Sequence, residues 1–151
     1  MKQVIFKIGD EEYGIDIFKV EAIEKSMPMI KVPSAPSHIA GIIDLRGEAL
    51  PVYDLRTRFG YPSGNIDIMI ITKMRGMKIA AAVDNVSEIV EADDSEVLKA
   101  PGLLQTEETA FVSKVTNVKG HMFISLDFDG IIKDEEMEAI ETMLKKAKEQ
   151  Q

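Results

Sequence analysis

The chain has 151 residues, of which 45% are apolar and 29% are charged, and its 18 basic and 26 acidic side chains give a net charge of −8. This composition is typical of one globular unit, or of two small subdomains that share a core, and a chain of this length buries roughly 68–70% of its unfolded surface. The acidic balance and the scattered cations argue against nucleic acid as a partner, because phosphate binding depends on clustered cations. The absence of cysteine excludes disulfides, thiolate metal sites and cysteine nucleophiles.

The N-terminal residues predict a β-hairpin with one half-buried face. Apolar residues alternate over positions 4–8, Gly9-Asp10 provides a turn, and the alternation resumes over positions 13–17. No apolar run in the chain approaches the roughly 20 residues that a membrane helix requires. An intracellular location is therefore allowed, and any association with a membrane is expected to go through another protein.

Residues 18–40 are predicted to connect this hairpin to the next one. The apolar spacing over residues 18–26 fits a short helix and a short strand equally well. Prolines at 28, 33 and 36 then exclude a regular helix between residues 27 and 37 and predict an extended connector.

Residues 41–60 form the most clearly patterned unit of the chain. A glycine turn at Arg46-Gly47 joins two short apolar strands. Asp54 is placed to cap a helical turn over residues 55–59, and Gly60 suits the end of that turn.

The loop at residues 61–65 is the best candidate for a boundary between two halves. A second hairpin is predicted over residues 66–83, and residues 86–90 continue as strand. Residues 92–109 are polar and acidic and are broken by Pro101-Gly102, which predicts a short helical piece within a long connection.

A third hairpin over residues 111–128 precedes a C-terminal helix at residues 134–150. Acidic side chains occupy the first turns of this helix and lysines its last turns, which complements the helix dipole. Its apolar stripe consists of Met137, Ile140, Leu144 and Ala147.

The chain repeats one of its units. Residues 44–55 recur 73 positions later as residues 117–128, with the shared pattern of Asp or Asn, an aliphatic residue, a cation, Gly and an apolar strand that ends in Asp. Residues 14–23 resemble residues 82–89 in a second, weaker similarity. The sequence therefore predicts two related β units, which are too few for a solenoid.

Candidate chemical groups are better explained by structure than by catalysis. Four aspartates stand at expected strand ends, Asp16, Asp54, Asp84 and Asp127. Paired carboxylates suit acid-base work or metal binding, but their recurrence in both units favours caps of the following turns. Residues 127–138 fail as a calcium loop because Ile131 and Ile132 occupy the positions of an oxygen ligand and a glycine. The two histidines lack the spacing of a zinc site, and no phosphate-binding or nucleophile-elbow motif occurs.

The chain resembles the CheW family, the coupling proteins of bacterial chemotaxis, over residues 4–132. The resemblance rests on residues 9–17, on Gly41 through the Asp-Leu-Arg-Gly turn to Leu55, on residues 83–86 and on the late strand that ends in Asp127. It implies a mainly β fold of two small five-stranded SH3-like barrels with a shared apolar junction and a C-terminal helix. The approximate halves are then residues 1–62 and 63–133, which can be interleaved, followed by the helix at 134–150.

The resemblance also implies a function. Members of the family are not enzymes and carry no metal or cofactor; they couple the cytoplasmic tip of methyl-accepting chemoreceptors to the regulatory domain of the histidine kinase CheA. The implied location is the cytoplasm, with recruitment to the inner membrane face through receptor-kinase arrays. A CheV-like scaffold is the alternative within this fold, disfavoured because the chain ends at Gln151 without a receiver domain. A small carboxylate enzyme or metal-binding protein that uses Asp54 and Asp127 is the alternative from another class.

Partner-binding residues follow from the resemblance by position, namely Val20, Gly41, Arg46, Val86 and Ile89. Arg46 and Gly41 match a signature associated with receptor coupling, and the three aliphatic residues match positions associated with partner contacts. The chain departs from the family at Asp44, where Asn is usual, and at Ala22, where many relatives carry a Glu that pairs with the arginine. Here Glu21 or Glu24 would have to serve instead.

Overall fold

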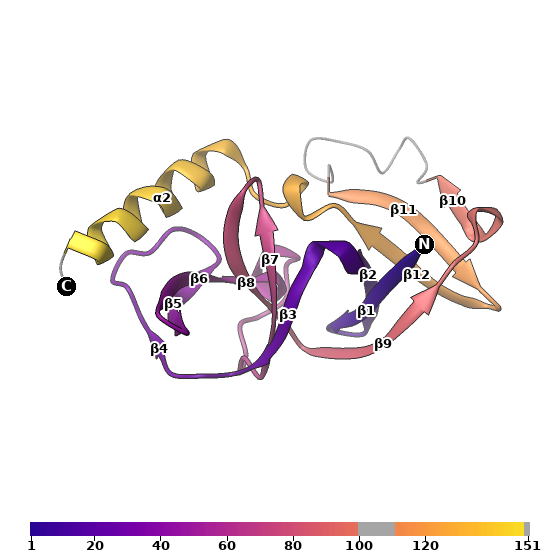
Figure 1. The fold of residues 1–151 in the computed structure, drawn as a ribbon, viewed down its shortest axis with the longest axis horizontal. Coiled ribbons are helices and arrows are strands. Elements are labelled where there is room, and N and C mark those ends of the chain that lie inside the picture. The colour runs from indigo at the N-terminus through magenta and orange to yellow at the C-terminus, as the bar shows by residue number, and fades with distance from the viewer. Residues whose placement is uncertain (100–110, 150–151) are drawn as a thin grey trace.

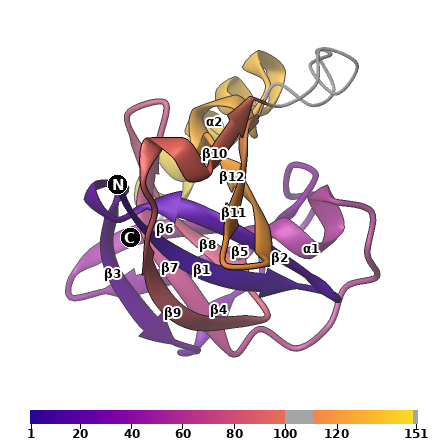
Figure 2. The same ribbon diagram turned by 90° about the vertical axis from the view of Figure 1, so that its right-hand side faces the viewer.

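Two β-sheets and one long helix make up the part of the chain that the computed structural model describes, residues 1–99 and 111–149. The sheets, named A and B below, lie side by side along the long axis, and the helix lies beside sheet B (Figure 1). Figure 2 views the molecule from the end of sheet A, whose strands curl in front of sheet B. Among the described residues, no helix has the length and apolar character needed to cross a membrane.

Each sheet has six strands within the described residues, where five were expected, because a short strand is added at one edge of each. Sheet A has the strand order β10 (Val97–Lys99), β11 (Val112–Val118), β12 (His121–Leu126), β2 (Glu11–Asp16), β1 (Lys2–Ile8) and β9 (Asn85–Glu91). Sheet B has the order β4 (Met29–Ile30), β5 (Ile39–Leu45), β6 (Glu48–Asp54), β8 (Met77–Val83), β7 (Ile68–Met74) and β3 (Val20–Lys25). The helical segments are η1 (Ile17–Lys19), α1 (Leu55–Arg58), η2 (Asp94–Glu96), η5 (Phe128–Gly130) and α2 (Asp134–Glu149).

These assignments settle two open points of the sequence analysis. The ambiguous segment after residue 18 is a strand, β3, because it pairs with β7 along one edge of sheet B. The predicted helical piece begins as the 3-10 turn η2 and passes directly into β10, which pairs with β11. The remainder of that predicted connection, residues 100–109, lies outside the described residues.

The two sheets repeat one another strand by strand. In both, a central parallel pair, β6–β8 or β12–β2, joins two antiparallel hairpins. Even the irregularities recur, since β5 shifts register between Ile39 and Gly41, and β11 shifts between Val112 and Lys114, 73 positions later. The equivalence between β1–β3 and β7–β9 runs at 66 positions, as shown by Gly14 opposite Ser125 and Ala80 opposite Val52.

The repeat is interleaved in the chain. Strands β1 and β2 start sheet A, β3 to β8 form sheet B, and β9 to β12 return to sheet A. A division at residue 62 would therefore cut through both sheets. The exact limits of the two subdomains stay a prediction.

The repeated turns show why the sequence pattern recurs. The Asp44 carboxylate accepts a hydrogen bond from the Gly47 amide at 2.8 Å, and the Asn117 side chain does the same for Gly120 at 3.0 Å. Arg46 and its counterpart Lys119 both adopt a φ of 51°, the left-handed conformation that a two-residue hairpin turn requires. Asp therefore replaces the usual Asn at position 44 without loss of the turn acceptor.

Three of the four strand-end aspartates cap the turn that follows. The carboxylates of Asp16, Asp54 and Asp127 accept hydrogen bonds from amides two residues on, at 3.0–3.1 Å. Asp84 differs, because it accepts from the Gly9 amide at 2.7 Å and from Arg56 at 2.6 Å. It ties the first hairpin of sheet A to the helix that follows β6.

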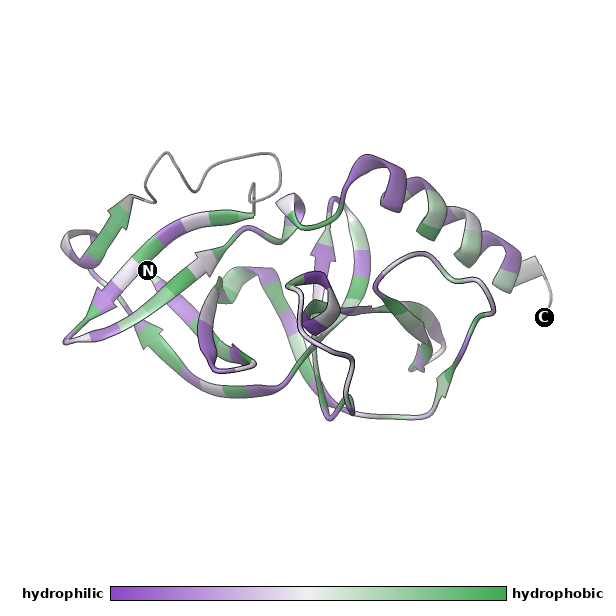
Figure 3. Cartoon of the chain, turned by 180° about the vertical axis from the view of Figure 1, so that it is seen from behind, coloured by the Kyte–Doolittle hydropathy of each residue, from purple (hydrophilic) through white to green (hydrophobic). Residues whose placement is uncertain are grey.

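A single apolar core joins the sheets and the helix. It includes Phe6 from sheet A, Tyr53 from sheet B and Ile140 from α2, all fully buried. Sheet B encloses a second apolar cluster within its own curl, so its central strands are buried on both faces. The predicted stripe of α2 packs on the shared core, and Figure 3 shows its alternation of apolar and polar residues.

Candidate partner-binding site

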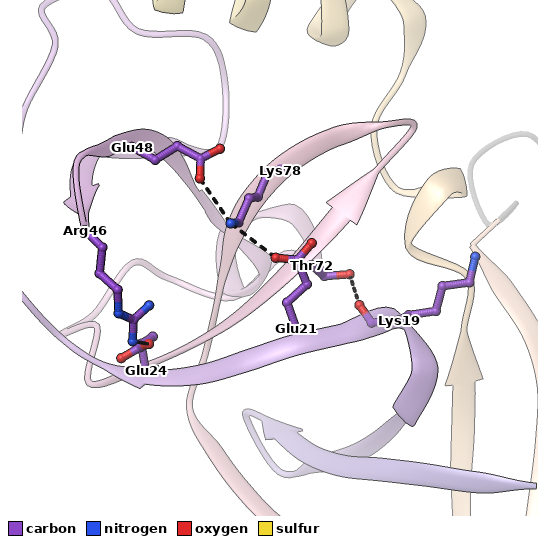
Figure 4. Close-up of polar contacts among 7 residues, drawn as sticks. All are labelled: Lys19, Glu21, Glu24, Arg46, Glu48, Thr72 and Lys78. Carbon is purple, nitrogen blue, oxygen red and sulfur yellow. Dashed lines mark hydrogen bonds and ion pairs between the residues drawn. The ribbon is translucent and has the colours of Figure 1, made fainter.

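Arg46 projects from the β5–β6 turn at the surface of sheet B. Its side chain is 73% exposed, and its Nη2 lies 2.7 Å from Oε1 of Glu24 on β3 (Figure 4). Of the two acidic candidates, Glu24 is thus the partner. Because β3 and β5 are not neighbours in the sheet, this ion pair spans the opening of the curled sheet and holds the arginine in place.

A second charged group lies on the same side of sheet B. Nζ of Lys78 on β8 lies 3.1 Å from Glu48 on β6 and 3.2 Å from Glu21 on β3 (Figure 4). The hydrogen bonds that the Lys78 ammonium donates to Glu48 and Glu21 raise the pKa of Lys78, so the ammonium stays charged. Figure 4 also shows Thr72 donating to the carbonyl of Lys19 at 2.7 Å, which fixes the start of β3.

Gly41 on β5 is buried inside the fold. A Cβ built on Gly41 would lie 2.5 Å from the carbonyl oxygen of Ile30 and 2.5 Å from Cγ of Met29. No side chain fits there without displacing β4. The structure therefore gives Gly41 a packing role, five residues before Arg46, and leaves it without a surface of its own.

The three aliphatic candidates lie on equivalent edge strands. Val20 on β3 and Val86 on β9 are half-buried and pack against the shared core. Ile89 on β9 is 59% exposed, and its counterpart on β3, Ile23, is 46% exposed. The five candidates are therefore divided between the two sheets: Arg46, Gly41 and Val20 belong to sheet B, whereas Val86 and Ile89 belong to sheet A.

Exposed apolar side chains mark further surface that the sequence analysis did not single out. Phe18 is 94% exposed, Ile30 68%, and Leu98 52%. Ile30 and Leu98 occupy equivalent positions on the short edge strands β4 and β10, where they pair with Ile42 and Val115. The sequence repeat found Ile23 beside Ile89, but β4 and β10 are too short to give a pattern.

The polar groups of the described residues are arranged for structure. No cluster of three or more His, Asp or Glu side chains in this part of the chain is placed to hold a metal ion. His121 on β12 contacts Glu12 on β2 and lies 3.8 Å from Glu88 on β9. The Tyr53 hydroxyl donates to Glu136 at 3.2 Å, and burial raises the pKa of this tyrosine. Exposed strand edges and a charged turn suit protein recognition by main-chain and side-chain contacts.

These features define a class of protein with a duplicated β fold and exposed apolar side chains on its strand edges. The family model of the CheW-like domain matches residues 2–136, and the chain belongs to this family of chemotaxis proteins. It is similar to the chemotaxis protein CheW of Rhizobium meliloti, with 28% identity over 139 residues and 90% of each chain covered. The CheW of Klebsiella aerogenes is 28% identical over 145 residues, covering 94% of this chain and 87% of that one.

A solved structure agrees with this assignment. The crystal structure of the scaffolding protein TtCheW from Thermoanaerobacter tengcongensis superposes with a TM-score of 0.80 at 32% identity. The alignment covers 89% of this chain and 94% of that chain. The mainly β fold expected from the sequence is confirmed.

Proposed function

We propose that this protein is a non-catalytic adaptor that couples the cytoplasmic tip of methyl-accepting chemoreceptors to the regulatory domain of the histidine kinase CheA. The observation that carries the proposal is the duplicated fold, which presents two equivalent strand edges, β3 and β9, with aliphatic side chains at matching positions. Two such edges allow two partners to be bound at once. Membership of the CheW-like family and the similarity to a scaffolding protein support this function.

Arg46 is assigned to partner capture through its long, exposed side chain. Glu24 orients the guanidinium without covering it, since 73% of the arginine side chain remains exposed. Each adaptor contact is expected at or below the standard interface of about 1,600 Å², so that each is weak alone. Multivalent assembly into an array then supplies the strength, and it recruits the protein from the cytoplasm to the inner membrane face.

A matched pair of variants tests the assignment of Arg46. Arg46→Asp is expected to weaken capture of a receptor tip fragment or a CheA regulatory domain by about tenfold or more, as measured by pull-down and titration. Lys119→Asp, made at the equivalent turn with the same φ of 51°, is the control and is expected to bind as the parent does. Equal losses in both variants, or none in either, would count against a role for Arg46.

A charge swap separates direct contact from orientation. Glu24→Arg combined with Arg46→Glu restores the internal ion pair but reverses the charge that a partner meets. Capture is expected to stay weak in this double variant. Full recovery would show that the ion pair matters only for the shape of the turn. Thermal unfolding of each variant checks that the fold is retained.

A further inference from the structure

A groove runs along one side of helix α2, away from the candidate partner-binding residues. It has a volume of about 1060 Å³ and lies between α2 and the segment of residues 30–36. Ile42 and Ala49 line it from sheet B, and Ile30, with 68% of its surface exposed, lies at its β4 side. None of Val20, Gly41, Arg46, Val86 or Ile89 contributes to its lining.

The helix side of the groove is polar at both ends and has small or half-polar residues between. Glu138, Thr142 and Lys146 line it, are spaced four residues apart, and are exposed. Residues at this spacing lie on the same side of a helix. Glu138 and Lys146 are therefore about 12 Å apart along the axis, with Thr142 midway. The small side chain of Ala139, next to Glu138 in the sequence, lets another backbone approach this end of the helix closely.

This face is complementary to itself. When two copies of α2 are placed antiparallel about a two-fold axis at Thr142, Glu138 of each copy lies opposite Lys146 of the other. The two ion pairs are identical by symmetry, as in an isologous interface. The antiparallel direction also opposes the two helix dipoles and places acidic N-terminal turns beside basic C-terminal turns.

We propose that the groove receives helix α2 of a second copy of this chain, so that the protein forms a two-fold dimer through paired Glu138 and Lys146 side chains. In this dimer the incoming helix covers Ile30 and the apolar lining from Ile42 and Ala49. The contact extends over about 18 Å of helix, from residue 135 to residue 147, and is small compared with the standard interface. The dimer is therefore weak and dependent on concentration and on salt. It does not rest on the proposed function, because it uses a different surface.

Reciprocal charge reversal tests this interface. Glu138→Lys places lysine opposite lysine in both symmetric pairs, and Lys146→Glu places acid opposite acid. Each variant alone is expected to be monomeric at concentrations where the parent is partly dimeric, on the order of 0.1–1 mM. An equimolar mixture is expected to form a heterodimer, because both pairs again join opposite charges. Sedimentation equilibrium measures all four samples.

The outcomes are decisive because both positions are exposed and the variants are expected to fold. Circular dichroism and the thermal midpoint check this. A mixture that stays monomeric would overturn the proposal, as would a parent chain that stays monomeric up to on the order of 1 mM. Ile30→Arg changes the opposite wall of the groove and adds a second test. This variant is expected to be monomeric at concentrations where the parent is partly dimeric. A monomeric parent in which Ile30→Arg instead weakens capture of a receptor fragment would assign the groove to a helix of another protein.

Discussion

The interiors of the two sheets differ at equivalent positions. Inside sheet B, residues Met69, Val52, Ile43 and Ala80 belong to a closed apolar cluster. The counterparts in sheet A are Gln3, Ser125, Thr116 and Gly14. The Ser125 hydroxyl donates to Oε1 of Gln3 at 2.8 Å and lies 3.4 Å from Thr116. A hydrogen-bonded group thus replaces aliphatic packing at matching points of one fold.

This difference shows that strand register does not depend on the chemistry of the interior. Both sheets keep the same pairing and the same register shifts. The glycine turns and the aspartate caps are common to both, whereas the interior side chains are not. The turns and the backbone ladder therefore specify the repeated fold, and the interior side chains have diverged within it.

An exchange of interior residues is expected to have the largest effect. Met69→Gln places an amide in a cluster of aliphatic side chains and is expected to lower the free energy of unfolding by about 3 kcal/mol. The reverse exchange, Gln3→Met, removes the acceptor of Ser125 but also removes a buried amide nitrogen that lacks a hydrogen-bond partner, and should cost about 1 kcal/mol. Urea unfolding measures both. Equal losses would contradict the proposed difference between the interiors.

The glycine on β2 gives the next largest effect. A Cβ on Gly14 would collide with Oε1 of Gln3 and lie 2.9 Å from the ring of Phe123. Gly14→Ala is therefore expected to cost about 2 kcal/mol by overpacking. Ala80→Gly at the equivalent position removes one methyl group and should cost about 1 kcal/mol. A Gly14→Ala variant as stable as the parent would show that Gln3 moves aside freely.

A smaller, pH-dependent effect is expected at His38. Its counterpart 73 positions later is Phe111, and both carbonyls accept from the amide of a capping aspartate. Burial, assisted by Arg58, lowers the pKa of His38 below its ordinary 6.5. The unfolded chain thus binds a proton at a higher pH than the folded chain, and stability falls as the pH drops from 6.5 to the folded pKa.

His38→Asn tests this dependence, since Asn tolerates the positive φ of 68° at this position. Urea unfolding at about pH 8 and about pH 5.5 should show a larger loss of stability for the parent than for the variant. A parallel decline in the two proteins would assign the pH dependence to other groups.

The exposed ion pair should have the smallest effect on stability. Arg46→Ala removes the ion pair with Glu24. Lys119→Ala, at the equivalent turn, removes no ion pair among the described residues. The two variants share the same backbone strain. Their free energies of unfolding should therefore differ by no more than about 0.5 kcal/mol. A difference above about 2 kcal/mol would make Arg46 a structural residue.

The turns and caps of the fold could be predicted from local sequence patterns. The repeat at 73 positions identified the turns at Gly47 and Gly120 and the caps at Asp54 and Asp127, because these features depend on neighbours in the sequence. The second similarity aligned residues 20–23 with residues 86–89 as the strand pairing does, but it was wrong by two residues at its start, where it aligned Asp16 with Asp84. The strand pairing places Asp16 with Ala82, at the same offset of 66 positions that relates Val20 to Val86.

Features that depend on curling of the sheets could not be predicted from the pattern of residues along the chain. The first strand was expected to have one half-buried face, yet Gln3 and residues 4–6 are all buried, because one face lies in the interior of sheet A and the other at the shared junction. The choice of Glu24 as the partner of Arg46 follows from the same curl, which brings opposite edges of sheet B together. Alternation of residues in a sequence reports one exposed face and does not report closure.

The interleaved order of the strands also sets the order in which the two sheets can form during synthesis. All strands of sheet B lie within residues 20–83 and are available as soon as that stretch has emerged. Strand β2 has to wait for β12, whose last residue is Leu126, before its parallel partner exists. During synthesis the first hairpin therefore has an unpaired strand edge. The nascent chain can form sheet B before β2 pairs with β12 to complete sheet A.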